Sequence, residues 1–211
     1  MESSTLIHEL YVSRNNLLDI MESQTYDTTN QRGFSINEIN SMYIEDGLDF
    51  TLSKSTGKKA YIKYWLQTTL KQQKIQEITE EMFSGDTEIT KDDTIIFIVK
   101  EEPNDTLKEY IRLMYETENI FIIIHNIKRL LYNLLNHSLV PKCRILSIEE
   151  VNQVKKRYNI TNDNQFPKLS RFDPLSLVIC FRPGEVMELL RSSKTSCITK
   201  YYRICVNETS D

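Results

Sequence analysis

The sequence is poor in glycine and contains no long hydrophobic run. Only 5 of its 211 residues are glycine, which excludes long glycine-rich linkers. The longest apolar runs, such as 95–99 and 120–124, have five residues each, whereas a membrane-spanning helix needs about 20. The first residues lack a basic segment followed by an apolar block. We therefore expect neither a transmembrane segment nor a secretory signal.

Cysteine and histidine are too scattered to form a recognisable metal or nucleophile motif. The four cysteines include no Cys-x-x-Cys pair and have no histidine among them, so we expect reduced, mostly buried thiols of an intracellular protein. A base role for His125 competes with the more common role of a lone histidine as a cap or packed polar residue. We predict no catalytic residue, no metal site and no cofactor. The residues considered are His8, His125, His137, Cys143, Cys180, Cys197 and Cys205.

The pair Gly57-Lys58 suggests a phosphate-binding loop, but its surroundings exclude one. Such a loop needs an earlier glycine at the position of Leu52, and a serine or threonine at the position of Lys59 to reach magnesium. Neither residue type is present. The segment is better explained as the loop of a β-hairpin between strands over 48–52 and 60–65.

Hydrophobic periodicity predicts an α/β domain in the first part of the chain. Apolar residues recur at helical spacing over 6–21, whereas 95–99 and 120–124 are short apolar segments separated by a helix over 105–117. This strand-helix-strand order is typical of parallel strands covered on both faces. The other patterns predict a short helix from Ser35, a helix over 66–82, and a helix from 130 to the Val140-Pro141 junction.

A domain boundary is predicted between residues 136 and 137. Shortly beyond it, Ser147 and Glu150 have the Ser-x-x-Glu spacing of a capping box, which predicts a helix over 149–158. A capped helix at Asp173-Pro174 follows, and then β-segments over 185–191 and 199–206. We expect a small α+β domain in residues 137–211.

The two parts of the chain differ in charge. Residues 1–136 carry 14 Lys and Arg against 22 Asp and Glu, a net charge of −8, whereas residues 137–211 carry 12 against 8, a net charge of +4. The two parts therefore present different electrostatic fields to a partner. Neither is basic enough to predict tight autonomous binding to DNA.

The run from His137 to Glu150 resembles the start of a known domain. It contains His-x-Leu-Val-Pro, a basic and apolar stretch, and then serine followed by Ile-Glu-Glu. It is similar to the C-terminal domain of the fifth-largest subunit of eukaryotic RNA polymerases, whose archaeal counterpart consists of little more than this domain. The resemblance continues in order through Tyr158, 166–169, Asp173-Pro174, Gly184, Val186, Arg191, Ser193, Thr195, 202–204 and Val206.

The resemblance implies a non-catalytic subunit of a multisubunit DNA-directed RNA polymerase. Residues 1–136 would be a lower-jaw domain beside the downstream DNA duplex, with an endonuclease-like topology and no active site. Residues 137–211 would be the assembly domain that docks on the largest subunit. Nucleotide addition belongs to the two largest subunits, so no cofactor is expected here. By motif position, the surface for the largest subunit includes Pro141, Lys142, Arg144, Asp173, Pro174, Arg191, Thr195, Tyr202 and Arg203.

Contact with DNA and nuclease chemistry are two further possibilities for the first domain. A basic cluster is a candidate for a position near DNA, although a solvated face explains it as well; its members are Lys54, Lys58, Lys59 and Lys63. A metal-dependent nuclease needs an acid-x-Lys triplet, and the best candidate, 98–100 after Asp92 and Asp93, begins with isoleucine. The alternatives to a polymerase subunit are a stand-alone transcription-associated adaptor and a metal-dependent nuclease.

Four departures separate this chain from the family pattern, one of which is Leu-Ser-Leu-Val at 175–178, where the family tends to have a Val-Ala-Arg-Tyr-like run after Asp-Pro. Cys143 replaces a second histidine, Cys180 replaces a glycine, and Lys-Thr-Ser-Cys at 194–197 replaces Glu-Thr-Ala-Gly. The last change reverses one charge, so an acidic group on the partner is expected if that site is buried in the interface. This drift is compatible with the polymerase of a large DNA virus, in the virion or a cytoplasmic viral factory, and with a diverged cellular paralogue in the nucleus. No membrane partner is expected.

Overall fold

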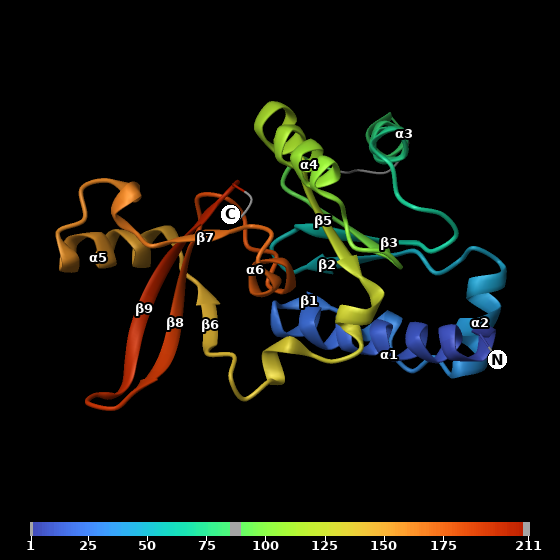
Figure 1. Cartoon of the computed structure of the whole chain (residues 1–211), viewed down its shortest axis with the longest axis horizontal. Helices are drawn as coiled ribbons and strands as arrows, with labels where there is room; N and C mark the ends of the chain where they lie inside the picture. Colours follow the sequence, from blue (N-terminus) through green and yellow to red (C-terminus); the bar gives the residue numbers. More distant parts are fainter. Residues whose placement is uncertain (1, 85–89, 209–211) are drawn as a thin grey trace. The chain divides into compact units, whose positions relative to one another are not determined.

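In the computed structural model, the chain has an α+β fold with two separate β-sheets, and residues 2–84 and 90–208 are described. The chain divides into two units, Met1–Asn133 and Leu134–Asp211, and each unit contains one of the sheets (Figure 1). The division therefore falls between Asn133 and Leu134, whereas the sequence motif placed it between 136 and 137.

The sheet of the first unit is mixed, with strand order β1-β2-β3-β4-β5. The first three strands are antiparallel neighbours, and β3, β4 and β5 are parallel. The parallel strand-helix-strand prediction is therefore confirmed, and the antiparallel strands make the whole unit α+β rather than purely α/β. The strands are β1 (Tyr26–Asp27), β2 (Phe50–Lys54), β3 (Lys59–Trp65), β4 (Thr94–Val99) and β5 (Phe121–Asn126).

Two helices of the first unit begin at capping side chains, and the cap at Ser35 was predicted from the sequence. The side chain of Ser35 accepts a hydrogen bond from the Glu38 amide, and the Glu38 carboxylate accepts one from the Ser35 amide. Asn104 caps the helix that connects β4 to β5. The helices are α1 (Glu2–Ser23), η1 (Thr29–Gln31), α2 (Ile36–Ile44), α3 (Gln72–Ser84), α4 (Asp105–Glu118) and η2 (Ile127–Leu130). None of the helices built from the described residues is long and apolar enough to cross a membrane.

Two predicted helices are wrong in extent. The helix expected over 66–82 begins only at Gln72, because Leu66 and Leu70 pack in the core as part of the connection that leaves β3. The helix expected from 130 onward is replaced by two short 3₁₀ turns, η2 and η3 (Leu134–Asn136). The Asn16 side chain donates to the Leu130 carbonyl at 2.8 Å, so this carbonyl is bonded to α1 rather than to a following helical turn.

The second unit is built on a sheet with strand order β6-β8-β9-β7. Its two long strands form an antiparallel hairpin, β6 pairs with β8, and β7 runs parallel to the end of β9. The sequence predicted β8 and β9 but missed the short strands β6 and β7. The elements are β6 (Lys142–Ile145), α5 (Ile148–Tyr158), η4 (Asp163–Gln165), β7 (Lys168–Ser170), α6 (Pro174–Val178), β8 (Val186–Ser193) and β9 (Cys197–Val206).

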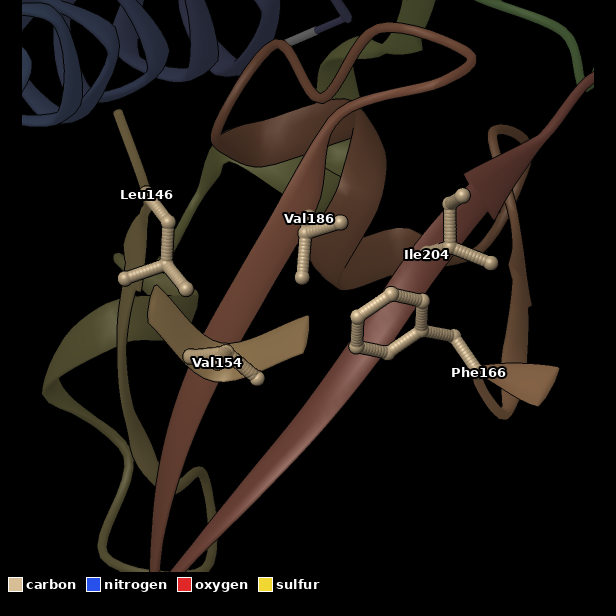
Figure 2. Packing of buried hydrophobic residues seen from close by; sticks show 5 residues of the cluster. All are labelled: Leu146, Val154, Phe166, Val186 and Ile204. Carbon is tan, nitrogen blue, oxygen red and sulfur yellow. The ribbon is translucent and has the colours of Figure 1, made fainter. Parts of the chain in front are cut away.

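Both faces of the second sheet are covered, so four successive residues of β8, 186–189, are buried. On one face, α5 supplies Val154 to a cluster that is shown in Figure 2 and consists of Leu146, Val154, Phe166, Val186 and Ile204. On the other face, Leu175 of α6 packs against a cluster of Ile179, Phe181, Met187, Leu189 and Cys205. Alternation of side chains along β8 assigns Val186 and Glu188 to the α5 face.

Candidate partner-binding surface

Glu188 is the electrostatic centre of the second unit. It lies on β8 opposite Arg144 of β6 and Tyr202 of β9, and only 8% of its side chain is exposed. Its carboxylate accepts hydrogen bonds from Arg144 Nε at 3.2 Å and Lys200 Nζ at 3.0 Å, and from the Tyr202 hydroxyl at 3.3 Å. Three strands are therefore joined through one buried carboxylate.

The surroundings of Glu188 keep it ionised. Burial raises the pKa of a carboxyl group, but the hydrogen bonds from Lys200 and Arg144 outweigh burial here, and the pKa of Glu188 lies below its ordinary value. Burial also raises the pKa of Tyr202 and the nearby Glu188 charge adds to that effect, so this hydroxyl stays protonated and donates. The site is a charged, hydrogen-bonded network without an acid or base poised for catalysis.

Two of the predicted partner-binding residues, Arg144 and Tyr202, meet at Glu188. Arg144 also contacts Glu150 of α5 at 2.7 Å, so its guanidinium is engaged within the unit. The Tyr202 ring lies 5.8 Å from the ring of Tyr158. Pro141 precedes β6, and Lys142 begins that strand opposite Leu190 of β8.

Asp173 and Pro174 begin α6 and cap it, which is the structural alternative to a role in partner binding. Asp173 Oδ1 accepts a hydrogen bond from the Leu175 amide at 2.9 Å, and Pro174 occupies the first helical turn. Pro174 remains exposed. The pair does not join the Glu188 network, and α6 packs against the face of the sheet opposite to α5.

The remaining predicted residues lie along the β8-β9 hairpin. The exposed Arg191 guanidinium lies 5.3 Å from the centroid of the Tyr201 ring, and Thr195 is in the connecting turn. Arg203 Nη1 donates to the Lys168 carbonyl at 3.1 Å, which ties β9 to β7. The structure thus distributes the predicted set over the sheet, the hairpin and the start of α6, rather than in one patch.

Two cysteines occupy backbone positions that favour glycine. Cys180 and Cys197 both have a φ of 54°, in the left-handed region, and both stand where the resembling family has glycine. A side chain in this conformation costs roughly 1–2 kcal/mol. The two cysteines therefore place backbone strain at positions where the sequence departs from the family pattern.

Two of the thiols, those of Cys143 and Cys205, are poorly suited to nucleophilic chemistry. Burial raises the pKa of Cys205 to about 12, and burial also raises the pKa of Cys143. No disulfide joins the four cysteines, all of which are among the described residues. Over residues 2–84 and 90–208, His, Cys, Asp and Glu side chains form no group of three or more that could hold a metal ion.

Asp93 and Ile98, which were considered for nuclease chemistry, are buried within the fold of the first unit. Asp93 is buried and accepts hydrogen bonds from the amides of Lys59, at 2.6 Å, and Thr90, at 2.8 Å. Ile98 is buried on β4, and Lys100 follows the strand's far end. Among the histidines, His125 is buried in β5, His8 is exposed on α1, and His137 Nδ1 accepts from the Leu139 amide.

The basic cluster of the first unit is only partly brought together. Lys54, Lys58 and Lys59 lie at the β2-β3 turn, where the Lys54 ammonium is 4.3 Å from the Tyr26 ring centroid. Lys63 lies further along β3 and forms an ion pair of 2.8 Å with Asp49. The β2-β3 turn, with its three lysines, is therefore the part of the predicted DNA-proximal set that the fold gathers.

Sequence reasoning missed Glu188 and a neighbouring aromatic groove. The groove has a volume of about 430 Å³ and is lined by residues from α5, from the segment before β7, and from β9. A signal for Glu188 was present in the apolar run 186–190, which contains a single acidic residue. The groove brings together segments that are distant in sequence, so no local sequence pattern predicts it.

Comparisons with known proteins point to one family. A family model of the RNA polymerase Rpb5 C-terminal domain matches residues 132–205. DNA-directed RNA polymerase subunit Rpo5 of Thermococcus kodakarensis is 38% identical over 77 residues, which are 36% of this chain and 93% of the relative. Rpo5 of Aeropyrum pernix is 42% identical over 73 residues, 35% of this chain and 80% of the relative. Rpo5 of Methanococcoides burtonii is 35% identical over 75 residues, 36% of this chain and 95% of the relative.

Proposed function

Because the chain belongs to the RNA polymerase Rpb5 family, whose archaeal relatives are Rpo5 subunits, we propose that it is a non-catalytic subunit of a DNA-directed RNA polymerase. The observation that carries this proposal is that the second unit matches Rpo5 subunits over nearly their whole length. Nucleotide addition would take place in the two largest subunits. The protein would act where its polymerase transcribes, which is the nucleus in a eukaryotic cell.

The experiment that tests this function is affinity capture of the tagged full chain from its native source. We expect the two largest polymerase subunits to be captured in amounts comparable to the tagged chain. Capture of the chain without polymerase subunits would support the stand-alone adaptor instead. Metal-dependent cleavage of DNA by the purified chain, lost in Asp93→Asn, would support the nuclease.

Within the polymerase, the second unit would dock on the largest subunit. Support comes from the family resemblance and from exposed residues among the predicted set, such as Lys142, Pro174, Arg191 and Thr195. Arg191 suits a bidentate pair with an acidic partner, because its guanidinium lies on the exposed hairpin beside Tyr201. Arg144, by contrast, is already paired with Glu150 and Glu188, so we assign it a positioning role.

Charge reversal at Arg191 tests this surface. Arg191→Glu should lower capture of the largest subunit about tenfold, equivalent to the loss of roughly 1.4 kcal/mol. Lys91→Glu reverses the same charge at an exposed residue of the first unit and should leave capture unchanged. Equal capture by both variants would remove Arg191 from the interface.

The first unit would form part of the jaw near the downstream DNA. Its mixed sheet, with parallel β3, β4 and β5, is compatible with the endonuclease-like topology implied by the resemblance. The lysines at the β2-β3 turn are the candidates for phosphate contacts, while Lys63 is paired with Asp49. Replacing Lys54, Lys58 and Lys59 by glutamine should lower the salt dependence of DNA binding by the whole polymerase.

The size of the decrease in salt dependence would report how many phosphate contacts these lysines make. Each lost phosphate contact should reduce the slope of log affinity against log salt by up to about 0.9. Lys63→Gln should change the slope less than any lysine at the turn. A slope that is unaffected by all four replacements would leave these lysines as a solvated face.

A further inference from the structure

The hairpin strand β9 has one side that is largely uncovered by strands. It pairs with β8 from Cys197 to Ile204. On its other side, β7 pairs only with 204–206. In Figure 1, the hairpin of β8 and β9 extends well past the short strand β7. Residues 197–203 therefore form an open sheet edge in the described part of the chain.

Backbone groups along this edge point outward at alternate residues. The Ile204 amide donates to the Pro167 carbonyl at 3.0 Å, on the β7 side, whereas the Cys205 amide donates to the Glu185 carbonyl at 2.9 Å, on the β8 side. Because strand residues alternate in direction and the register with β8 is continuous, Lys200 and Tyr202 share the direction of Ile204. Their N–H and C=O groups face the side that β7 leaves open.

The aromatic groove lies against this edge. It is lined by Tyr158, Asn159 and Ile160 at the end of α5, by Gln165, Phe166 and Pro167 before β7, and by Lys200, Tyr201 and Tyr202 of β9. Tyr158 and Tyr201 are 52% and 46% exposed, which is unusual beside an edge that natural sheets normally protect. A strand added at β9 would bury an apolar side chain against the Tyr158 ring, which lies beside Tyr202 on the α5 face of the sheet.

Charge around the groove favours an acidic occupant. The Arg157 guanidinium lies 5.7 Å from the centroid of the Tyr158 ring, and Lys200 lines the groove. The nearby acids are already neutralised, because Asp163 pairs with Lys155 and Glu188 pairs with Lys200 and Arg144. A second copy of this strand would bring its own lysine and tyrosines to a basic rim, so self-pairing is disfavoured.

We propose that the open edge of β9 binds an extended, acidic segment of another polymerase subunit as an added β-strand, with an apolar side chain in the groove beside Tyr158 and Phe166. This inference rests on the proposed function and names the mode of docking and the chemistry of the partner segment. The added strand continues the position of β7 along β9. Its backbone pairs with Lys200 and Tyr202, and its carboxylates face Arg157.

The full-length variants Lys200→Pro and Lys200→Ala test the backbone pairing. Both lose the ion pair with Glu188, but only proline lacks the outward N–H. Proline is tolerated at a sheet edge where the N–H faces away from the sheet. We expect Lys200→Pro to capture at least about tenfold less polymerase than Lys200→Ala, since it removes a ladder hydrogen bond and blocks close approach. Equal capture would overturn the inference.

Wild-type capture separates this result from the proposed function. If the wild type captures no polymerase, the proposed function itself fails. If the wild type and both variants capture polymerase equally, the function stands and strand addition is wrong. Arg157→Glu should also reduce capture, and unchanged capture would refute the acidic character of the partner segment.

Residue-resolved hydrogen exchange tests the same pairing without mutation. In the free chain, the Lys200 and Tyr202 amides should exchange much faster than those of Tyr201 and Arg203, which turn toward β8. In the assembled polymerase, Lys200 and Tyr202 should become protected by at least about tenfold. Rapid exchange that persists after assembly would overturn the inference, and this measurement decides the matter if Lys200→Pro does not fold.

Discussion

Replacing Glu188 with glutamine should destabilise the second unit while preserving the shape of the side chain. A charge-assisted hydrogen bond contributes about 1.5–3 kcal/mol when well buried. The two cationic partners, Arg144 and Lys200, are 52% and 54% exposed, so solvent screens both ion pairs. We therefore assign about 1 kcal/mol to each pair and expect Glu188→Gln to cost roughly 2 kcal/mol.

The cost should depend on pH in a defined direction. The pKa of Glu188 is lowered in the folded state, mainly because the hydrogen bonds from Lys200 and Arg144 outweigh burial. A lowered folded pKa means that the stabilisation is fully present above the unfolded-state pKa, near about 4.3, and is lost as pH falls through the folded value. The difference between wild type and Glu188→Gln should be constant from pH 7 to about 5 and shrink below about 4.

Hydrogen exchange of the β8 and β9 amides measures this change locally. A loss of 2 kcal/mol corresponds to about a 30-fold decrease in protection where exchange requires unfolding of the unit. Glu149→Gln removes the same charge from an exposed position on α5 and should have little effect. Unchanged protection in Glu188→Gln at pH 7, or a difference that grows as the pH falls, would refute the account of this network.

The other predictions concern backbone strain, core packing and helix capping. Cys197→Gly should raise the stability of the hairpin by about 1 kcal/mol in hydrogen exchange, because glycine removes the strain at φ 54°. Cys197→Ala should leave the stability unchanged, because alanine retains the strain. Phe166→Ala should cost about 3–5 kcal/mol, measured by the same exchange, since this ring is only 2% exposed in the cluster of Figure 2. Asn104→Ala should cost about 1 kcal/mol in chemical unfolding followed by Trp65 fluorescence, since it removes the α4 cap, whereas Asn104→Asp should retain most of the stability.

Helices and strands with strong periodicity were predicted well because their sequence pattern and their burial agree. The apolar positions of 6–21 form the buried face of α1, and the two wholly apolar strands lie side by side in the first sheet. Short strands were missed because β1 and β7 have too few residues to show alternation. The helix expected after 130 failed because Asn16, distant in sequence, bonds the Leu130 carbonyl.

Charged residues showed the limits of local patterns most clearly. In the sequence, Arg14 looks like an ordinary polar residue of a helix. In the structure it is only 3% exposed, and its guanidinium lies 4.1 Å from the Phe50 ring centroid. Burial lowers the pKa of Arg14, and the Leu48 carbonyl and Gln31 side chain accept its hydrogen bonds. No property of α1 alone distinguishes this arginine from a solvated one, because its partners lie on other elements.

The sequence by itself determined the family, the helix caps and the residues of the main strands, because motifs, caps and periodicity depend on neighbours along the chain. Only the tertiary structure decided that Glu188 gathers Arg144, Lys200 and Tyr202, and that β9 keeps an open edge beside an aromatic groove. Strand order and register create these contacts. They join residues far apart in sequence, and such long-range pairing leaves no local signature.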